Sequence, residues 1–247
     1  MNDLETYFYN NRGRLIDKWV HYFEIYHRHL SRYRNTDVHV VEFGVFKGGS
    51  LQMWKHYFGP HAHIYGVDID EECKQFEEEQ VQIHIGDQEN RGFLRDLAQR
   101  IPRMDILIDD GGHTMKQQIA TFEELYPHIS DDGIYIGEDL HTSYWPAYGG
   151  GLYKKKSFIE FSKRMIDRLN AWHYYERNPE FLDSVARTTH SLHYYDSVLV
   201  VEKRPISPPR RMQTGPETVT IPGFQKKKRS ILRRIASRIR KRFFPRR

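Results

Sequence analysis

Two acidic clusters, each following a short apolar run, are the residues of this sequence best suited to chemistry. The run Ile-Leu-Ile at 106–108 leads into Asp109, Asp110 and His113, and the run Ile-Tyr-Ile-Gly at 134–137 leads into Glu138 and Asp139. If both runs are parallel strands of one sheet, Asp110, Glu138 and Asp139 emerge at the same edge. Carboxylates that converge there repel one another unless a cation lies between them. An all-oxygen set selects a hard ion, so we predict a Mg²⁺ or Mn²⁺ site.

Two histidines accompany these clusters. His113 lies three residues beyond Asp110, and because an imidazole titrates near neutral pH, we predict that His113 acts as a general base. Asp109 is expected to support the loop or a water of the metal, or to contact a cofactor. His141 is either part of the metal's surroundings or an ordinary loop histidine, and we favour the second interpretation.

A glycine-rich turn follows the first apolar run, in the stretch EFGVFKGGS at 42–50. Glycines let the backbone turn sharply and let a ligand approach it closely. The spacing differs from the Gly-x-Gly-x-x-Gly of dinucleotide enzymes and lacks the end of a P-loop. Asp68 ends the second run, where a carboxylate can accept hydrogen bonds from both hydroxyls of a ribose. Asp87 and Gln88 follow the third run, where an adenine ring can lie.

These features together resemble the class I S-adenosylmethionine-dependent methyltransferases. More narrowly, the two acidic clusters with His113 resemble the metal-dependent sugar O-methyltransferases of macrolide antibiotic tailoring, over about residues 38–203. The resemblance implies a Rossmann-like α/β fold with a mainly parallel seven-stranded sheet, an antiparallel last strand and helices on both faces. It implies His113 as the base, and Asp110, Glu138 and Asp139 as metal ligands. It implies cofactor contacts from Glu42, Gly44, Lys47, Gly48, Ser50, Asp68, Asp87, Gln88 and Asp109.

The elements that must position these residues alternate along the chain. Apolar runs at 38–44, 63–68, 81–85, 104–108, 133–136 and 193–202 predict strands, and amphipathic patterns at 50–57, 71–79, 90–99, 115–126 and 155–170 predict helices. Such alternation specifies a parallel sheet covered on both faces, with ligands beyond the carboxyl ends of its strands. The domain organisation we predict is an N-terminal helical segment at 1–35, a catalytic domain at 36–204, a Pro-rich linker at 205–225 and a basic tail at 226–247.

Two aromatic groups flank the predicted catalytic residues. Leu15, Trp19, Tyr22, Phe23 and Tyr26 recur at helical spacing, which favours packing in the core or in a dimer over a ligand site. The second group follows the second acidic cluster and precedes three glycines. It is either a lid that stacks on a sugar or a surface turn, and the sequence favours neither; its members are Tyr144, Trp145 and Tyr148.

The composition bounds the class of protein. A chain of 247 residues suggests one compact domain with appendages. No apolar stretch approaches the roughly 20 residues that cross a bilayer, and the first residues do not resemble a secretory signal. The single cysteine, Cys73, favours a reducing compartment. We therefore expect a cytoplasmic protein. The N-terminal region and the tail differ from those of the family, which leaves the acceptor and the oligomeric state open. We expect a homo-oligomer.

The charge is concentrated at one end. Residues 226–247 hold twelve Lys and Arg and no acid, which leaves 26 basic residues against 33 acidic ones in the remainder. Apolar residues recur at helical spacing within this tail, a pattern typical of binding to an anionic membrane surface. Nucleic acid is disfavoured because phosphate binding gives no reason for the apolar stripe, and a solubilising tail is the third interpretation. The stripe comprises Ile231, Leu232, Ile235, Ile239 and Phe243.

The sequence therefore predicts a methyltransferase that uses S-adenosylmethionine and Mg²⁺ (or Mn²⁺) on a sugar hydroxyl of a glycan, a lipid-linked glycan or a glycosylated natural product. Three alternatives remain: methylation of a catechol-like phenol, a related Fe-dependent hydroxylase, and a non-catalytic adaptor for membrane or nucleic acid.

Overall fold

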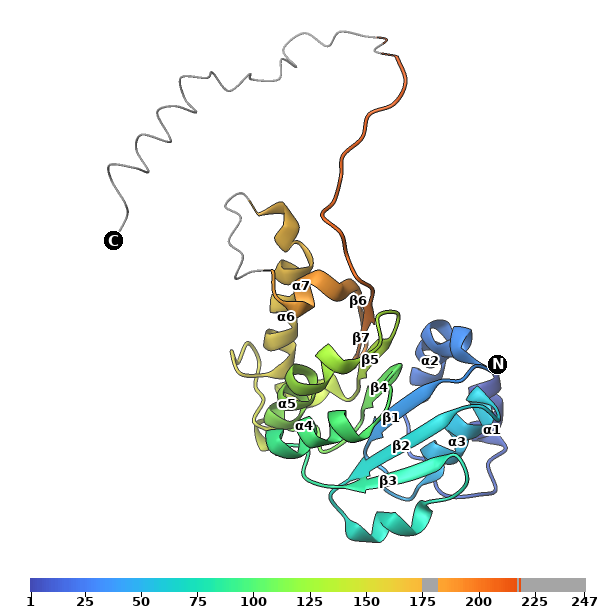
Figure 1. The fold of residues 1–247 in the computed structure, drawn as a ribbon. Helices are drawn as coiled ribbons and strands as arrows, with labels where there is room; N and C mark the ends of the chain where they lie inside the picture. Colours follow the sequence, from blue (N-terminus) through green and yellow to red (C-terminus); the bar gives the residue numbers. More distant parts are fainter. Residues whose placement is uncertain (175–181, 217, 219–247) are drawn as a thin grey trace. The chain divides into compact units, whose positions relative to one another are not determined.

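The computed structural model describes residues 1–174, 182–216 and 218. Its centre is a seven-stranded sheet with the strand order β3-β2-β1-β4-β5-β7-β6 (Figure 1). Neighbouring strands from β3 to β5 pair in parallel, whereas β7 is antiparallel to both β5 and β6. The strands are β1 (His39–Phe43), β2 (His63–Asp68), β3 (Val81–Ile85), β4 (Ile106–Asp109), β5 (Ile134–Gly137), β6 (Thr189–Tyr195) and β7 (Val198–Lys203).

Most of the α-helices begin at a residue whose side chain caps free backbone N–H groups. Thr114 and Gln117 form a capping box at the start of α5, and the side chains of Asn90 and Ser157 cap α4 and α6. The α-helices are α1 (Asp3–Tyr9), α2 (Tyr22–Leu30), α3 (Gly49–Phe58), α4 (Arg91–Arg100), α5 (Met115–Leu125), α6 (Phe158–Leu169) and α7 (Ser184–Thr188). Short 3₁₀ helices are η1 (Ser31–Tyr33), η2 (Glu71–Phe76), η3 (Tyr126–His128), η4 (Leu140–Tyr144), η5 (Pro146–Tyr148) and η6 (Ala171–His173).

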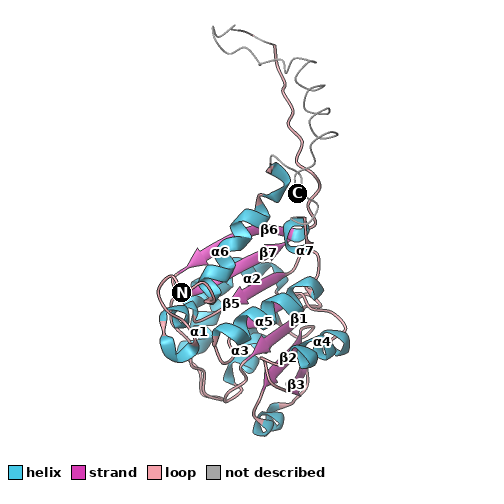
Figure 2. Ribbon diagram, turned by 90° about the vertical axis from the view of Figure 1, so that its left-hand side faces the viewer, coloured by secondary structure: helices cyan, strands magenta, loops and turns pink. Residues whose placement is uncertain are grey.

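Side chains alternate along the strands and build one apolar core on each face of the sheet. Val40, Ile64 and Ile106 pack against residues of α1, α2 and α3, whereas Val41 and Leu107 face α4, α5 and α6. Figure 2 shows the sheet between these helices. The predicted Rossmann-like fold with an antiparallel last strand is confirmed, and the carboxyl ends of the parallel strands meet at one edge.

Three predicted elements differ from the structure. The run at 193–202 is not one strand: Asp196 and Ser197 turn the chain between β6 and β7, and Ser197 takes a positive φ of 63°. The stretch at 71–79 forms the 3₁₀ helix η2 instead of an α-helix. The N-terminal stripe is wrong in its first half, because Leu15 and Trp19 lie outside any helix and are more than half exposed.

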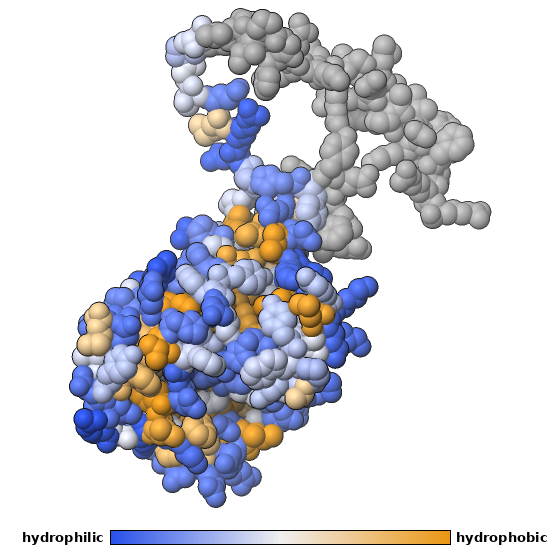
Figure 3. Space-filling view, turned by 180° about the vertical axis from the view of Figure 1, so that it is seen from behind, coloured by the Kyte–Doolittle hydropathy of each residue, from blue (hydrophilic) through white to orange (hydrophobic). Residues whose placement is uncertain are grey.

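The chain separates into two compact units, Met1–Pro208 and Pro209–Arg247. The N-terminal helices thus belong to the same unit as the sheet, and the predicted tail at 226–247 lies outside the described residues. On the face drawn in Figure 3, hydrophobic side chains of the first unit form separate groups among hydrophilic ones. Among the described residues, none of the helices has the length and apolar character needed to cross a bilayer.

Candidate active site

A cavity of about 860 Å³ lies at the carboxyl ends of the parallel strands. Two groups of residues line it. We name the first after the predicted cofactor contacts and the second after its carboxylates. The cofactor end comprises Gly44, Phe46, Lys47, Asp68, Asp70, Cys73, Gly86, Asp87 and Gln88. The carboxylate end comprises Asp17, Lys18, Trp19, Tyr22, Asp110, His113, Glu138 and Asp139.

The glycine turn of the cofactor end needs its glycines for steric reasons. Gly44 has a φ of 89°, and a Cβ there would lie 2.0 Å from the carbonyl oxygen of Asp110. Gly48 has a φ of 71° at the N-terminus of α3, and a Cβ there would lie 2.8 Å from the Phe76 ring. Side chains rarely adopt such a backbone. The turn therefore approaches both its neighbour after β4 and η2 more closely than other residues allow.

Asp68 fixes this turn in place. Its Oδ2 accepts hydrogen bonds from the backbone N–H groups of Val45 (2.9 Å) and Phe46 (3.1 Å), and its Oδ1 accepts one from Asp70. The carboxylate also lines the cavity, as do Lys47 and Asp87. Asp68 therefore holds the backbone of the turn and still presents oxygen atoms to a ligand; its predicted contact with a ribose stays a prediction.

Gln88 and Asp109 are engaged with each other rather than with open space. The Gln88 amide donates to Asp109 Oδ1 (2.6 Å) and to Thr121 (2.9 Å), and it accepts from the Gly112 N–H (3.1 Å). Tyr135 donates to Asp109 Oδ2 (3.0 Å), and the Asp109 side chain does not line the cavity. The Asp109 carboxylate thus lies behind the cavity wall, where it orients Gln88, and its expected cofactor contact stays a prediction.

Glu42 and Ser50 also lie behind the cavity wall. Ser50 Oγ (2.7 Å) and Trp54 Nε1 (2.9 Å) both donate to the carboxylate of Glu42, which is fully buried. Neither Glu42 nor Ser50 nor Gly48 lines the cavity. Their geometry supports a structural contribution, in which Glu42 ties β1 to the first turns of α3.

The carboxylate end contains a cation from the protein itself. The ammonium of Lys18 lies 2.5 Å from Asp110 Oδ2, 3.0 Å from Glu138 Oε2 and 3.5 Å from Glu42 Oε1. The Lys18 side chain is only 3% exposed. The predicted convergence of acidic residues thus occurs at Asp110 and Glu138, and their charge is balanced by a residue from the N-terminal segment.

Burial and charge oppose each other at this end. Burial by itself lowers the pKa of Lys18, but Asp110 and Glu138 outweigh it and hold that pKa well above its ordinary value. Burial raises the pKa of Glu138 well above its usual range, and the nearby charge of Asp110 raises it further. Carboxylates in this environment hold their negative charge only with a cation beside them. They are therefore suited to bind positive charge.

Asp139 and His113 complete the carboxylate end from two strained turns. Both take positive φ values, 52° for Asp139 and 54° for His113, which are uncommon for such residues and cluster at functional sites. His113 Nε2 lies 3.7 Å from Asp110 Oδ1 and 3.5 Å from Asp139 Oδ2. Tyr22 of α2 donates to Asp139 Oδ1 (2.7 Å). Ligand atoms of Asp110, His113 and Asp139 lie within 4.8 Å of one another, so His113 is also placed to contribute to a metal site.

The aromatic residues predicted to contact substrate do not line the cavity. Tyr144 and Trp145 are about half exposed, and Trp145 packs edge-on against His141 with centroids 4.6 Å apart and near Tyr148 at 5.8 Å. His141 in turn contacts Trp19, which lines the cavity. His141 Nδ1 is 2.6 Å from Ser197 Oγ, which agrees with an ordinary loop histidine.

Sequence reasoning missed the segment that closes the carboxylate end. Asp17, Lys18 and Trp19 line the cavity, whereas the pattern placed this stretch in a helix facing the core. A signal was available: Asn10, Asn11 and Gly13 are loop-forming residues that interrupt the helical pattern just before Lys18. A lysine that follows such a loop, between an acidic residue and a tryptophan, was a candidate for a side chain that points into a ligand site.

Comparisons with known proteins agree with this geometry. Residues 41–140 match a family described as a methyltransferase domain. The chain is 38% identical over 198 residues to the 8-demethyl-8-alpha-L-rhamnosyl tetracenomycin-C 2'-O-methyltransferase of Streptomyces olivaceus, covering 76% of this chain and 52% of that protein. It is 38% identical to the demethylmacrocin O-methyltransferase of Streptomyces fradiae, covering 76% and 51%.

A solved structure extends the comparison. The MycE methyltransferase from the mycinamycin biosynthetic pathway, in complex with Mg, SAH and mycinamycin VI, has a TM-score of 0.72 and 33% identity, over 82% of this chain and 53% of that one. The chain thus spans about half the length of the relatives it matches. The match across β1 to β5 and the confirmed fold lead to one conclusion: residues 41–140 form a methyltransferase domain, set in a Rossmann-like fold.

Proposed function

We propose that this protein transfers a methyl group from S-adenosylmethionine to a sugar hydroxyl, with Mg²⁺ (or Mn²⁺) as the second cofactor. One observation carries the proposal: a single cavity joins the glycine turn and Asp68 to the cluster of Asp110, His113 and Asp139. One relative is named as an O-methyltransferase of a rhamnosyl tetracenomycin, which supports a glycosylated natural product as acceptor. A glycan or lipid-linked glycan is the wider class.

The residues at the cofactor end fit an S-adenosylmethionine ligand. Gly44 lines this end of the cavity, and Asp68 and Asp87 offer carboxylate oxygens at the ends of β2 and β3. This ligand supplies a methyl group on a positively charged sulfur. Lys47 lines the same end, where its ammonium is placed for a carboxylate.

The residues at the carboxylate end fit a divalent cation. The ammonium of Lys18 stands there between Asp110 and Glu138, so the site is already built to hold positive charge. Asp110, Glu138 and Asp139 are the proposed ligands, and their oxygen atoms are those that Mg²⁺ prefers. A Mg²⁺ ion held there would lower the pKa of a sugar hydroxyl that reaches it.

His113 is the proposed general base. Its Nε2 takes the hydroxyl proton, and Asp110 and Asp139 at 3.7 and 3.5 Å stabilise the imidazolium that forms. S-adenosylmethionine held at the cofactor end would supply the methyl group: the sugar oxygen would bond to the methyl carbon as the carbon–sulfur bond broke and its electrons returned to sulfur. Because the fold fixes both ends of one cavity, positioning contributes much of the acceleration.

The acceptor enters, on this proposal, past the aromatic residues of the carboxylate end. Trp19 lines the cavity, and its contact with His141 connects it to Trp145 and Tyr148. Exposed tryptophan faces suit the apolar faces of a sugar ring. Tyr144, Trp145 and Tyr148 therefore stay proposed acceptor contacts outside the cavity.

The partners predicted for the rest of the chain are also proposals. Residues 226–247 are proposed to bind an anionic membrane surface at the inner face of the cell membrane, on the strength of their charge and apolar spacing. Removing them should end sedimentation with anionic liposomes and leave methyl transfer intact. Homo-oligomer formation is proposed from the aromatic N-terminal segment, and sedimentation velocity tests it.

The function is tested by methyl transfer to rhamnosylated and other glycosylated polyketides. Labelled S-adenosylmethionine should deliver one methyl group per acceptor in the presence of Mg²⁺, excess chelator should abolish transfer, and added metal should restore it. A catechol serves as the competing acceptor. Faster methylation of the catechol than of every glycoside would contradict the sugar assignment, and full turnover in chelator would remove the metal from the mechanism.

A further inference from the structure

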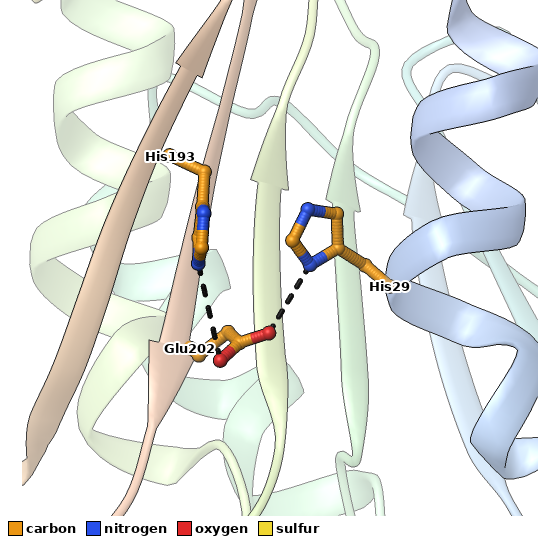
Figure 4. A group of neighbouring side chains, drawn as sticks. All are labelled: His29, His193 and Glu202. Atoms are coloured by element: carbon orange, nitrogen blue, oxygen red, sulfur yellow. Dashed lines mark hydrogen bonds and ion pairs between the residues drawn. The ribbon is translucent and has the colours of Figure 1, made fainter.

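A second cluster of ligand-type side chains lies away from the cavity, where α2 packs beside the sheet. His29 comes from α2, His193 from β6 and Glu202 from β7, and Figure 4 shows both imidazoles turned toward the carboxylate. His29 Nδ1 lies 3.1 Å from Glu202 Oε1, and His193 Nε2 lies 3.9 Å from Glu202 Oε2. All three ligand atoms lie within 4.8 Å of one another. Three elements far apart in the sequence thus meet at one point.

The hydrogen bonds around the cluster orient its ligand atoms. His29 Nε2 bonds to the Tyr195 hydroxyl at 2.9 Å, so Nδ1 is the nitrogen that faces Glu202. A partner on the second ring nitrogen is the arrangement that orients metal-binding histidines. The side chain of His29 is 5% exposed, that of Glu202 22% and that of His193 37%. The cluster is therefore covered on the helix side and accessible from the other.

The charge of Glu202 is not balanced by a strong cation. Among the described residues, its ion-pair partners are only the two histidines. Two imidazoles and one carboxylate form a donor set that binds Zn²⁺ with a water molecule in the fourth position.

A second group of two histidines and one carboxylate differs from this cluster in the charge around its carboxylate. Asp37, His39 and His63 are also close together. However, Arg103 Nη1 lies 3.2 Å from Asp37 Oδ2, and the Asp37 side chain is 62% exposed. Because the guanidinium already neutralises the charge of Asp37, this group should bind a metal less tightly. It therefore serves as a matched control.

We propose that His29, His193 and Glu202 bind one Zn²⁺ ion, which joins α2 to the β6–β7 hairpin. The hydroxyl of Ser191 lies 3.0 Å from both His193 Nε2 and Glu202 Oε2. On this proposal, binding of the ion displaces the hydroxyl. The site differs from the carboxylate end in its nitrogen donors. The ion would bind to α2, the helix whose Tyr22 donates a hydrogen bond to Asp139.

The test uses the full chain without an affinity tag, stripped of metal, and titrates it calorimetrically with Zn²⁺ in excess Mg²⁺. His193→Gln should abolish one Zn²⁺ site per chain, and this exposed position limits any effect on folding. Tyr195→Phe should weaken the site by roughly 10- to 100-fold by releasing the His29 ring. His63→Gln, in the matched control group, and Asp110→Asn, at the carboxylate end, should retain it.

A thermal measurement adds a second readout. Zn²⁺ at 100 times its dissociation constant should raise the melting temperature of the wild-type chain by roughly 5–10 °C and leave that of His193→Gln unchanged. Equal Zn²⁺ binding by His193→Gln and the wild type would overturn the proposal. Loss of the site in Asp110→Asn alone would overturn it as well, by moving the zinc to the carboxylate end.

Discussion

The two ends of the cavity are assembled in different ways. The cofactor end comes from a continuous part of the chain between Gly44 and Gln88, in which the lining residues lie at or after the carboxyl ends of β1, β2 and β3. The carboxylate end combines turns after β4 and β5 with Lys18 and Tyr22, which precede the whole sheet in the sequence. The matched methyltransferase domain begins at residue 41, so these two residues lie outside it.

The fold alone supplies the cofactor end, whereas the segment that precedes the sheet contributes to the carboxylate end. In this sheet topology, the turns after the parallel strands bring backbone groups and carboxylates to one edge of the sheet. The balance of charge at the carboxylate end depends instead on a side chain that arrives from another segment. Variants at the two ends should therefore fail in different ways: those at the cofactor end in ligand affinity, and those at the carboxylate end in turnover or stability.

The largest effect is expected for His113→Ala. Loss of the proposed general base should lower kcat by roughly 10²- to 10⁴-fold, with the affinity for S-adenosylmethionine nearly unchanged. Single-turnover kinetics and calorimetry measure the two quantities separately. His141→Ala is the control, because His141 bonds to Ser197 and does not line the cavity. A parallel loss of cofactor affinity in His113→Ala would break the division between the two ends.

Lys18→Met comes next. It leaves Asp110 and Glu138 buried without their cation, so the free energy of unfolding in chelator should fall by about 3–5 kcal/mol. Added Mg²⁺ should restore more stability to this variant than to the wild type. Denaturant titration with and without Mg²⁺ measures both. Lys116→Met removes an exposed lysine from its pair with Glu89 and should change stability little. Equal stabilities of Lys18→Met and wild type in chelator would contradict the charge-balancing role.

Asp68→Ala tests the cofactor end. Removing the carboxylate should weaken binding of S-adenosylmethionine roughly 10- to 100-fold, since hydrogen bonds to a charged group contribute about 1.5–3 kcal/mol. Asp68→Asn keeps one acceptor for the Val45 and Phe46 N–H groups and should lose less. Calorimetry decides, with Mg²⁺ affinity as the quantity that should not move. Unchanged cofactor affinity in both variants would remove Asp68 from the binding site.

Tyr135→Phe should have the smallest effect, about 1.5 kcal/mol, because it removes one hydrogen bond to the buried Asp109. Burial raises the pKa of Asp109 to about 6. Since this folded-state pKa lies above the unfolded one, the contribution of Asp109 to stability is present at low pH and is lost as the pH rises through about 6. The lost bond favoured the ionised form, so the variant should be destabilised more at pH 8 than at pH 5. The opposite order in urea titrations would refute this account.

Much of the fold and the positions of the strand-end residues could be predicted, because local patterns determine them. Apolar runs followed by Gly44, Asp68 or Asp110 specify strands and their turns, and the parallel sheet brings those turns together. The direction in which a side chain points after its strand could not be predicted. Asp109 and Asp110 are neighbours, yet one lies behind the wall and the other lines the cavity. The loop before Lys18 could be read from the sequence, but the partners of Lys18 could not, because they lie far away in the sequence.

Gly44 limits which parts of this cavity can change in sequence. The space that a side chain at this position would occupy holds the backbone of Asp110, and the N–H of Asp110 bonds to the Phe43 carbonyl. The turns after β1 and β4 therefore touch through their main chains. On the proposed function, the span over which the methyl group travels is set by peptide geometry and is insensitive to most substitutions. Acceptor preference can then drift through the aromatic residues outside the cavity while the transfer distance is inherited unchanged.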